Sequence, residues 1–156
     1  MNNDSTAQKP HTITIVNDVL IPELTQLINQ GHSITLPLRG NSMRPFLKDG
    51  RDKALLKATD KPQVGDAVLA EIKPSVWVLH RIIKIEGNNV TLRGDGNLSN
   101  EYCKTGDIKA KAVAFYRKGK DTPDTVDGMK WKAYSWAWTR LYPIRRYLLF
   151  IYRHLA

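Results

Sequence analysis

Apolar residues recur at helical spacing close to the start of the chain. From Leu20 to Ile28 they fall on one face of a 3.6-residue repeat, and Gly31 is a stop signal for such a helix. The pattern therefore predicts a helix over residues 17–31. Residues 1–10 are polar and without periodicity, and we expect them to form a disordered tail.

Short apolar runs separated by turn residues follow this helix. They predict β-strands over residues 33–38, 53–57, 67–72, 76–86, 89–94 and 110–117. The run 76–86 is apolar on both faces, which favours a central strand over an edge strand. Nothing between residues 33 and 117 has the pattern of a βαβ unit. The predicted fold class is therefore mainly β, with an N-terminal helix and a C-terminal basic, aromatic helical segment.

The same pattern divides the chain into segments. Residues 11–117 are predicted to form one domain that contains the N-terminal helix and the strands. The sequence KGKDTPDTVDG, residues 118–128, is polar and is predicted to be a linker. Residues 129–156 are predicted to be helical, and Pro143 should interrupt this helix.

Composition narrows the classes of function. The chain of 156 residues has a net charge of +9, which favours an anionic partner such as a membrane surface, a nucleic acid or an acidic peptide. Cys103 is the single cysteine, so no internal disulfide can form. The polar N-terminus does not have the pattern of a secretory signal. The longest apolar run, YLLFIY, is far shorter than the roughly 20 residues that span a bilayer.

The segment 131–156 carries much of the positive charge and no acidic residue. Its apolar and aromatic residues form a stripe at helical spacing: Trp131, Tyr134, Trp138, Leu141, Leu148 and Tyr152. Such a stripe either docks on the β core or lies on an anionic membrane surface. The charge favours the membrane, so we expect a protein that is cytoplasmic or peripheral on the inner face of the cell membrane. We do not expect a nucleic-acid partner, because no known binding module is present.

The segment VWVLHRIIKIEGNNVTLRGDGN contains a hairpin signal, EGNNV, at its centre. A two-residue loop after Glu86 would place His80 opposite Asp95, and a three-residue loop would place it opposite Gly96. Either register brings Asp95 within about one residue of His80, and directly opposed Cβ atoms lie roughly 5 Å apart. The hairpin therefore offers the imidazole of His80 a carboxylate partner. The neighbouring Arg81 is expected to pair with an acid or to cover apolar surface.

Ser42 lies in the glycine-flanked stretch RGNSMRPFLKDG. A hydroxyl in such a turn either bonds to the local backbone or acts as a nucleophile. A serine nucleophile needs a base, and a histidine whose second ring nitrogen is held by a carboxylate suits that role. The candidate catalytic residues are therefore Ser42 as nucleophile, His80 as base and Asp95 as the acid that orients it. The hairpin does not fix the distance from Ser42 to His80, which lie in different elements.

Other chemistries have less support in the sequence. Cys103 lacks the constrained turn that surrounds Ser42, so it is a poor candidate for a nucleophile. A metal at His80 and Asp95 would lack a third ligand at metal-binding spacing. We therefore predict neither a metal nor a cofactor.

Four motifs occur in one order along the chain: GNSMRPFLKDG, QVGDAVLAEI, LHRIIKI and LRGDGN. Together they resemble the type I signal peptidase superfamily, which also includes the self-cleaving SOS-type repressors. The resemblance covers roughly residues 30–117 and implies the β core of that superfamily. It implies that Ser42, the serine before Met, is the nucleophile. The usual bacterial enzymes have a lysine base where this chain has His80, so the chain resembles the archaeal and endoplasmic-reticulum branch, which uses Ser, His and Asp.

The chain departs from the pattern of that family in several places. The branch carries a second Asp six residues after its Gly-Asp pair, where this chain has Glu101, so Glu101 is the alternative orienting acid and Asp95 would then be a structural turn residue. The family often has a serine two positions before the nucleophile, where this chain has Gly40. The oxyanion would then depend on the Ser42 backbone N–H and another main-chain donor. The Gly-Asp pair after the nucleophile is Gly-Arg-Asp here, and no segment matches the membrane anchor of signal peptidases.

These observations predict a serine endopeptidase of the signal-peptidase-like type. The resemblance implies that it removes a leader or signal segment with small residues before the cut from a precursor. Two alternatives remain open: a catalytically inactive peptide- or membrane-binding module with the same fold, and a self-cleaving peptidase of the repressor type. Against the second, no helix-turn-helix domain precedes the core in this sequence.

Overall fold

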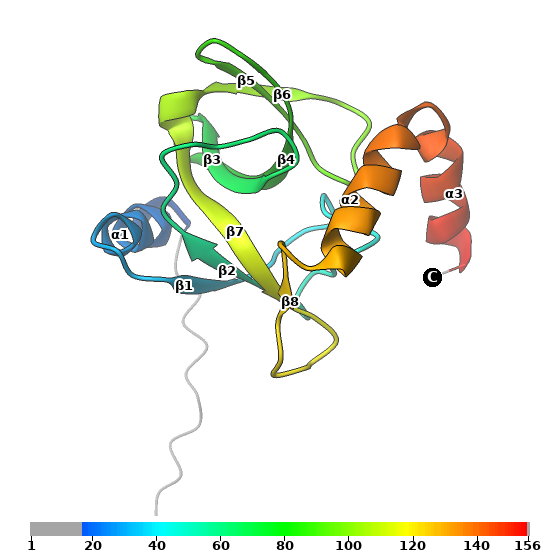
Figure 1. The fold of residues 1–156 in the computed structure, drawn as a ribbon, viewed down its shortest axis with the longest axis horizontal. Helices are drawn as coiled ribbons and strands as arrows, with labels where there is room; N and C mark the ends of the chain where they lie inside the picture. Colours follow the sequence, from blue (N-terminus) through cyan, green and yellow to red (C-terminus); the bar gives the residue numbers. More distant parts are fainter. Residues whose placement is uncertain (1–16, 156) are drawn as a thin grey trace, which may run out of the picture.

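The structure is a computed structural model, and it describes residues 17–155. Its eight strands form one antiparallel sheet in the order β1-β2-β7-β3-β4-β5-β6, with β8 paired to β7 (Figure 1). The strands are β1 (Ile34–Pro37), β2 (Lys53–Lys57), β3 (Ala67–Lys73), β4 (Val76–Glu86), β5 (Asn89–Arg93), β6 (Glu101–Lys104), β7 (Ile108–Tyr116) and β8 (Asp124–Thr125). The predicted mainly β class is thus confirmed. The disordered tail predicted for residues 1–10 lies outside the described residues.

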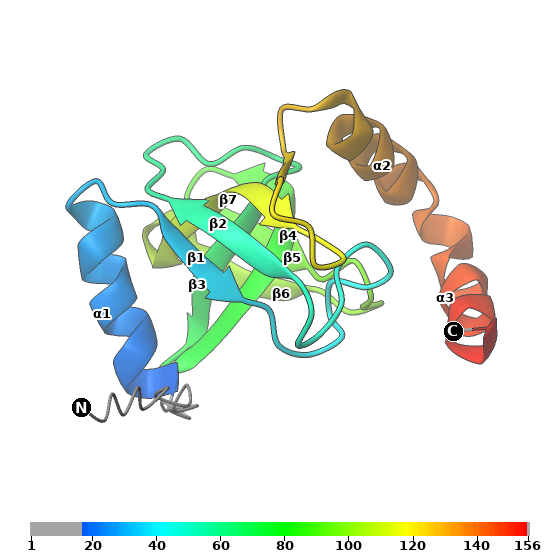
Figure 2. The same cartoon turned by 90° about the horizontal axis from the view of Figure 1, so that it is seen from below.

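Three α-helices and two short 3-10 helices accompany the sheet. They are α1 (Asn17–Asn29), η1 (Thr105–Asp107), α2 (Met129–Arg140), η2 (Tyr142–Ile144) and α3 (Arg145–Leu155). Helix α1 lies at one end of the molecule, and α2 and α3 lie at the other (Figure 2). The interruption predicted at Pro143 is observed, because η2 separates α2 from α3.

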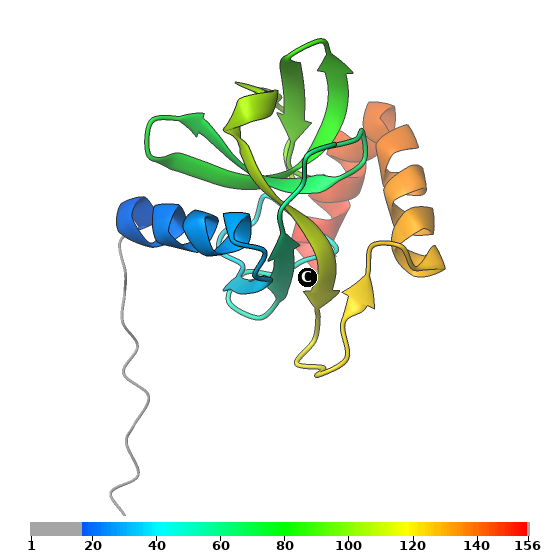
Figure 3. The same cartoon turned by 60° about the vertical axis from the view of Figure 1, so that its left-hand side comes forward.

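The sheet carries a hydrophobic cluster on each of its faces. The first includes Ile28 of α1, Leu69 of β3 and Phe115 of β7, and it extends to Trp131 of α2. The second is formed by Val68, Ala70, Ile82, Val90 and Leu92. Strand β7 joins the two halves of the sheet because it pairs with both β2 and β3 (Figure 3). The strand predicted to be central, β4, lies between β3 and β5.

Two strands were not predicted from the sequence. Strand β6, with the sequence EYCK, is short and polar and alternates between half-buried and exposed residues, so it lacks the apolar run that marks the other strands. Strand β8 has two residues and lies within the segment 118–128 that was predicted to be a linker. The linker prediction is therefore corrected, because Thr125 and Asp124 pair with Ala114 and Phe115 of β7.

Helix α2 is part of the core. Trp131 is buried, and its ring centroid lies 4.8 Å from that of Phe46 and 4.6 Å from that of Phe115. Trp138 is also buried. The aromatic stripe of the C-terminal segment therefore faces the protein at α2, where the docked interpretation is the one observed. Helix α3 behaves differently: Leu149 is buried, whereas Phe150 is 62 % exposed.

We predict that Trp131→Ala lowers the free energy of unfolding by about 3–5 kcal/mol, because it removes a large buried side chain. The matched control is Trp136→Ala, which changes an exposed tryptophan of the same helix and should alter stability by less than about 1 kcal/mol. Urea denaturation followed by circular dichroism measures both values. Equal effects of the two substitutions would contradict the docking of α2 on the core.

Candidate active site

Ser42 lies in the loop that joins β1 to β2. The loop is closed at its base, where the Leu38 N–H donates to the Asp52 carbonyl at 2.9 Å and the Gly50 N–H donates to the Leu38 carbonyl at 3.0 Å. The fully buried Asp52 carboxylate accepts the Lys48 N–H at 3.0 Å and is paired with Arg51. These bonds fix the ends of the segment that presents Ser42.

The electrostatics of Asp52 favour its charged form. Burial alone would raise the pKa of this carboxyl, but hydrogen bonds from Arg51 and from the backbone N–H groups of Lys48 and Lys118 lower it below the ordinary value. The inserted Arg51 of the Gly-Arg-Asp sequence is thus a counter-ion for Asp52. The loop base is therefore held by a carboxylate that stays ionised at neutral pH.

Ser42 itself is half-buried, between exposed Asn41 and buried Met43. Met43 belongs to the first hydrophobic cluster and anchors the turn next to Ser42. Among the described residues, the backbone N–H of Ser42 donates no hydrogen bond. It is thus free to act as the oxyanion donor expected from the sequence. Gly40 has a φ of 82°, a conformation that favours glycine.

His80 reaches the site from the middle of β4. The hairpin after Glu86 has the two-residue loop, since Glu86 pairs with Asn89. The register then shifts between Ile82 and Lys84, so that Arg81 pairs with Arg93. This β-bulge moves His80 away from the predicted position opposite Asp95 and brings it to Gly94. The His80 Nε2 atom lies 3.1 Å from the place where a Cβ of Gly94 would stand.

Glu101 is the acid that contacts His80. Its Oε2 atom forms a short hydrogen bond with His80 Nδ1. The register explains the contact: Glu101 pairs with Leu92, and Leu92 pairs with Ile82, which lies two residues from His80 on the same face of β4. An ionised carboxylate only accepts, so with Glu101 ionised His80 donates from Nδ1 and, in the neutral ring, its Nε2 atom carries no proton.

Asp95 does not orient His80 in the structure, so the first choice made from the sequence is corrected in favour of Glu101. Its carboxylate forms two bonds with the buried Arg81 instead, from Nε at 2.9 Å and from a terminal nitrogen at 2.7 Å. The physical reason is the β-bulge, which places Asp95 on the face of the sheet that Arg81 occupies. The expectation that Arg81 pairs with an acid is confirmed.

Helix α2 completes the surroundings of Asp95. The Tyr134 hydroxyl donates to Asp95 Oδ2 at 3.0 Å, and the Trp138 indole N–H donates to the Asp95 carbonyl at 2.9 Å. Arg81 also donates to Ser135 Oγ at 2.6 Å, and it lies 5.0 Å from the Trp131 ring centroid. Burial and the nearby Asp95 charge raise the pKa of Tyr134 well above its ordinary range, so it remains a donor.

The two glycines that flank Asp95 allow the 94–96 turn to pack against the Ser42 loop. The Gly96 N–H donates to the Ser42 carbonyl at 2.7 Å. A Cβ at Gly96 would lie 2.5 Å from the Asn41 carbonyl oxygen, and one at Gly94 would collide with the Ser42 carbonyl oxygen. Both positions therefore require glycine. The turn connects the network around Asp95 to the backbone of the candidate nucleophile.

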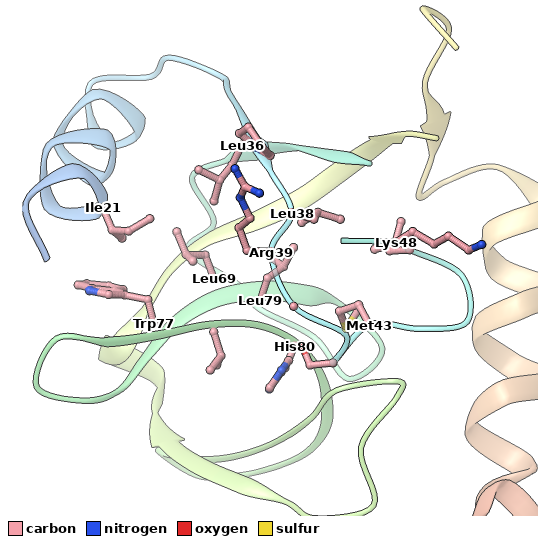
Figure 4. Close-up of a pocket in the computed structure, with 15 residues that line it drawn as sticks. Ile21, Leu36, Leu38, Arg39, Met43, Lys48, Leu69, Trp77, Leu79 and His80 are labelled. Atoms are coloured by element: carbon pink, nitrogen blue, oxygen red, sulfur yellow. The ribbon is translucent and has the colours of Figure 1, made fainter. Parts of the chain in front are cut away.

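Ser42 and His80 border the same pocket, which has a volume of about 170 Å³. Figure 4 shows that the pocket extends from Ile21 and Trp77 at one end to His80 and Met43 at the other. Its wall is largely apolar and includes Leu36 of β1 and Leu69 of β3. Among the described residues, no hydrogen bond joins Ser42 Oγ to His80, whose ring is bonded to Glu101.

The remaining candidates from the sequence lie away from this arrangement. Cys103 is half-buried on β6, and burial raises the pKa of its thiol, which disfavours the reactive thiolate. Residues 17–155 contain no cluster of three or more side chains suited to hold a metal ion. Comparisons with protein-family models, with curated proteins and with solved structures find no match to this chain.

Sequence reasoning did not identify Tyr134 and Trp138 as neighbours of the site. They were assigned only to an aromatic stripe, because helical spacing shows which residues share a face but not what that face contacts. The signal that could have pointed to them is a cation and an acid placed close together, Arg81 in the long apolar run and Asp95 in the glycine-flanked turn after the next strand. Such a pair needs further hydrogen-bond donors and acceptors around it.

We predict that Gly94→Ala lowers the free energy of unfolding by about 1–3 kcal/mol, because the added methyl group must displace the Ser42 backbone or the His80 ring. Gly106→Ala is the matched control, since a Cβ there meets nothing within 4 Å. Thermal unfolding of both variants checks the prediction. A Gly94 variant as stable as the Gly106 variant would show that the 94–96 turn does not pack against Ser42.

Proposed function

We propose that this protein is a serine endopeptidase of the signal-peptidase-like type. The observation that carries the proposal is the bond between Glu101 and His80 Nδ1, together with the pocket that both His80 and Ser42 line. A histidine held in one tautomer by a carboxylate, next to a constrained serine, suits acyl transfer. The order of the four sequence motifs supports the same class.

In the proposed mechanism, Ser42 Oγ attacks the scissile carbonyl carbon while His80 Nε2 takes the hydroxyl proton. Glu101 accepts the hydrogen bond from Nδ1 and stabilises the imidazolium that forms. The Ser42 backbone N–H donates to the developing oxyanion. His80 then gives the proton to the leaving amine, and a water molecule activated by the same imidazole releases the acyl group.

The surroundings of the pocket suit an extended peptide. Strand β1 is the last strand of the sheet on its side, and the first half of β4, before Arg81, is paired with β3 but not with β5. Each therefore has one free edge, and extended peptides bind by adding a strand to such an edge. The small apolar pocket matches the small residues before the cut that the family resemblance implies. A leader or signal segment is the substrate class we propose.

We predict that Ser42→Ala lowers kcat/KM by at least about 1,000-fold, because no other group supplies the nucleophile. The assay is cleavage of a proteome-derived peptide library, with new termini identified by mass spectrometry. Ser33→Ala, which removes an exposed serine before β1, should leave the cleavage pattern unchanged. If the Ser42 variant produces the same cleavage products as the wild type, the protein is not a Ser42 peptidase.

Substitutions of the two acids near the site should affect different properties: one lowers catalysis and the other lowers stability. Glu101→Gln is expected to lower kcat by on the order of 10³- to 10⁴-fold, because the neutral amide can donate to His80 Nδ1 and favour the other tautomer, and because it lacks the charge that stabilises the imidazolium. The melting temperature should change little. Asp95→Asn is expected to lower the free energy of unfolding by about 3–5 kcal/mol, because it leaves the buried Arg81 without a counter-charge. Kinetics and urea denaturation of both variants provide the comparison. If Asp95→Asn lowered kcat and Glu101→Gln lowered the free energy of unfolding instead, Asp95 would be the orienting acid.

We also propose that the protein works at an anionic membrane surface, on the inner face of the cell membrane, through α3. No helix in residues 17–155 is long and apolar enough to cross a bilayer. The outer side of α3 and η2 nevertheless exposes large apolar side chains: Ile144, Tyr147, Phe150, Ile151 and Leu155. Arg146 lies beside them, and the segment contains no acid. Apolar side chains bordered by arginine suit insertion among anionic headgroups.

We predict that the double variant Phe150→Ser/Ile151→Ser binds vesicles of phosphatidylglycerol and phosphatidylcholine about tenfold more weakly or worse, since it removes two of the inserting side chains. Val64→Ser/Leu98→Ser, which changes exposed apolar residues elsewhere, is the control. Co-sedimentation with vesicles measures both. Equal binding of the two double variants would remove α3 as the membrane contact.

A further inference from the structure

The Ser42 loop borders a second pocket, of about 220 Å³, whose other wall is α3. The first pocket reaches Ile21 of α1, and α1 and α3 lie on opposite sides of the molecule (Figure 2). The two pockets therefore lie on opposite sides of the loop that presents Ser42. The second pocket is lined by Asn41, Arg44, Gly96, Leu149, Tyr152 and Arg153.

This second pocket carries uncompensated positive charge. Neither Arg44 nor Arg153 forms an ion pair with any acid in residues 17–155. The nearest acid along the chain from Gly96 is Asp95, whose carboxylate is held by Arg81 and Tyr134. The pocket is thus lined by two arginines whose charge is not neutralised by an ion pair within residues 17–155.

Two buried polar atoms of residues that line this pocket also lack partners. Arg44 Nε and Tyr152 Oη are inaccessible to solvent, and neither forms a hydrogen bond within the described residues. Buried polar atoms are nearly always hydrogen-bonded in native proteins. The Tyr152 hydroxyl and the two guanidinium groups, one of which includes Arg44 Nε, are therefore the candidate donors for an oxyanion such as a carboxylate or a phosphate group.

We propose that this pocket binds a carboxylate of the substrate on the C-terminal side of the scissile bond. The inference rests on the proposed peptidase function. If the apolar pocket on the α1 side holds the residues before the cut, the chain that continues past Ser42 runs towards the α3 side. Asn41 and Arg44 flank Ser42 within two positions, and an extended residue spans roughly 3.3 Å. An Asp or Glu among the first three residues after the cut is thus within reach of the pocket.

The experiment compares cleavage products from a proteome-derived peptide library, without lipid. Wild-type protein should cut preferentially where Asp or Glu occupies one of the three positions after the cut. A synthetic peptide taken from such a product, and its Asn or Gln counterpart, should differ in kcat/KM by about tenfold or more. Arg153→Met, on the solvent side of α3, should bring this ratio close to one.

Arg140→Met is the matched control, because Arg140 is an exposed arginine of α2 that stacks on Trp136 and does not line the pocket. It should keep the ratio of the wild-type protein. Arg44→Met is a second test of the pocket, and thermal unfolding shows whether it folds. The proposal would be overturned if the Arg153→Met variant and a folded Arg44→Met variant both kept the wild-type ratio of kcat/KM between the acidic peptide and its amide counterpart.

The outcomes separate this inference from the function on which it rests. Ser42-dependent cleavage without acidic preference overturns the inference and leaves the peptidase in place. The absence of any Ser42-dependent cleavage overturns the peptidase function and the inference with it. If acidic preference is absent and both arginine variants bind phosphatidylglycerol vesicles more weakly, the pocket takes a lipid phosphate, and the proposed substrate carboxylate is wrong.

Discussion

The buried ion pair between Arg81 and Asp95 is the interaction on which the arrangement of the site depends. A pair removed from water stabilises a protein only when its remaining hydrogen-bonding groups are also satisfied. Here Ser135 and the Gly65 carbonyl accept from Arg81, and Tyr134 donates to Asp95. The network joins β4, the 94–96 turn and α2. That turn in turn carries the hydrogen bond to the Ser42 carbonyl.

The two faces of one strand thus serve two purposes. His80 and Arg81 are neighbours on β4 and point to opposite faces, because side chains alternate along a strand. His80 lies on the face of the second hydrophobic cluster, where Glu101 reaches it, since its partner Val68 belongs to that cluster. Arg81 lies on the face of α2, since its partner Ala67 belongs to the first cluster. The His80–Glu101 pair and the Arg81–Asp95 pair therefore lie on opposite faces of the sheet.

Much of this arrangement could be predicted from the sequence, and there are physical reasons why the rest could not. Alternation and turn residues locate six of the eight strands, and the hairpin signal at Gly87 and Asn88 gives the correct two-residue loop as one of two choices. The bulge at Ile83 carries no such signal, because an extra residue in an apolar run leaves the hydrophobic pattern almost unchanged. That single residue changes the partner of His80 from Asp95 to Glu101. The polar strand that contains Glu101 is also hard to recognise from sequence.

The C-terminal segment shows a second limit of prediction from sequence. Helical spacing correctly groups Trp131, Tyr134 and Trp138 on one face. What spacing cannot supply is the surface that the face meets, because that depends on contacts between residues far apart in the sequence. The aromatic face of α2 covers Asp95, while the outer side of α3 remains open.

The position of Tyr134 and Trp138 along the chain has a consequence for synthesis. Chains fold as they leave the ribosome, with earlier residues first. Ser42, His80 and Glu101 all emerge before α2, yet the turn that positions the Ser42 loop has its full set of partners only once α2 has docked. A nascent chain that stops short of α2 thus holds Ser42, His80 and Glu101 without the frame that aligns them, and these three residues take up their final arrangement only after α2 has emerged.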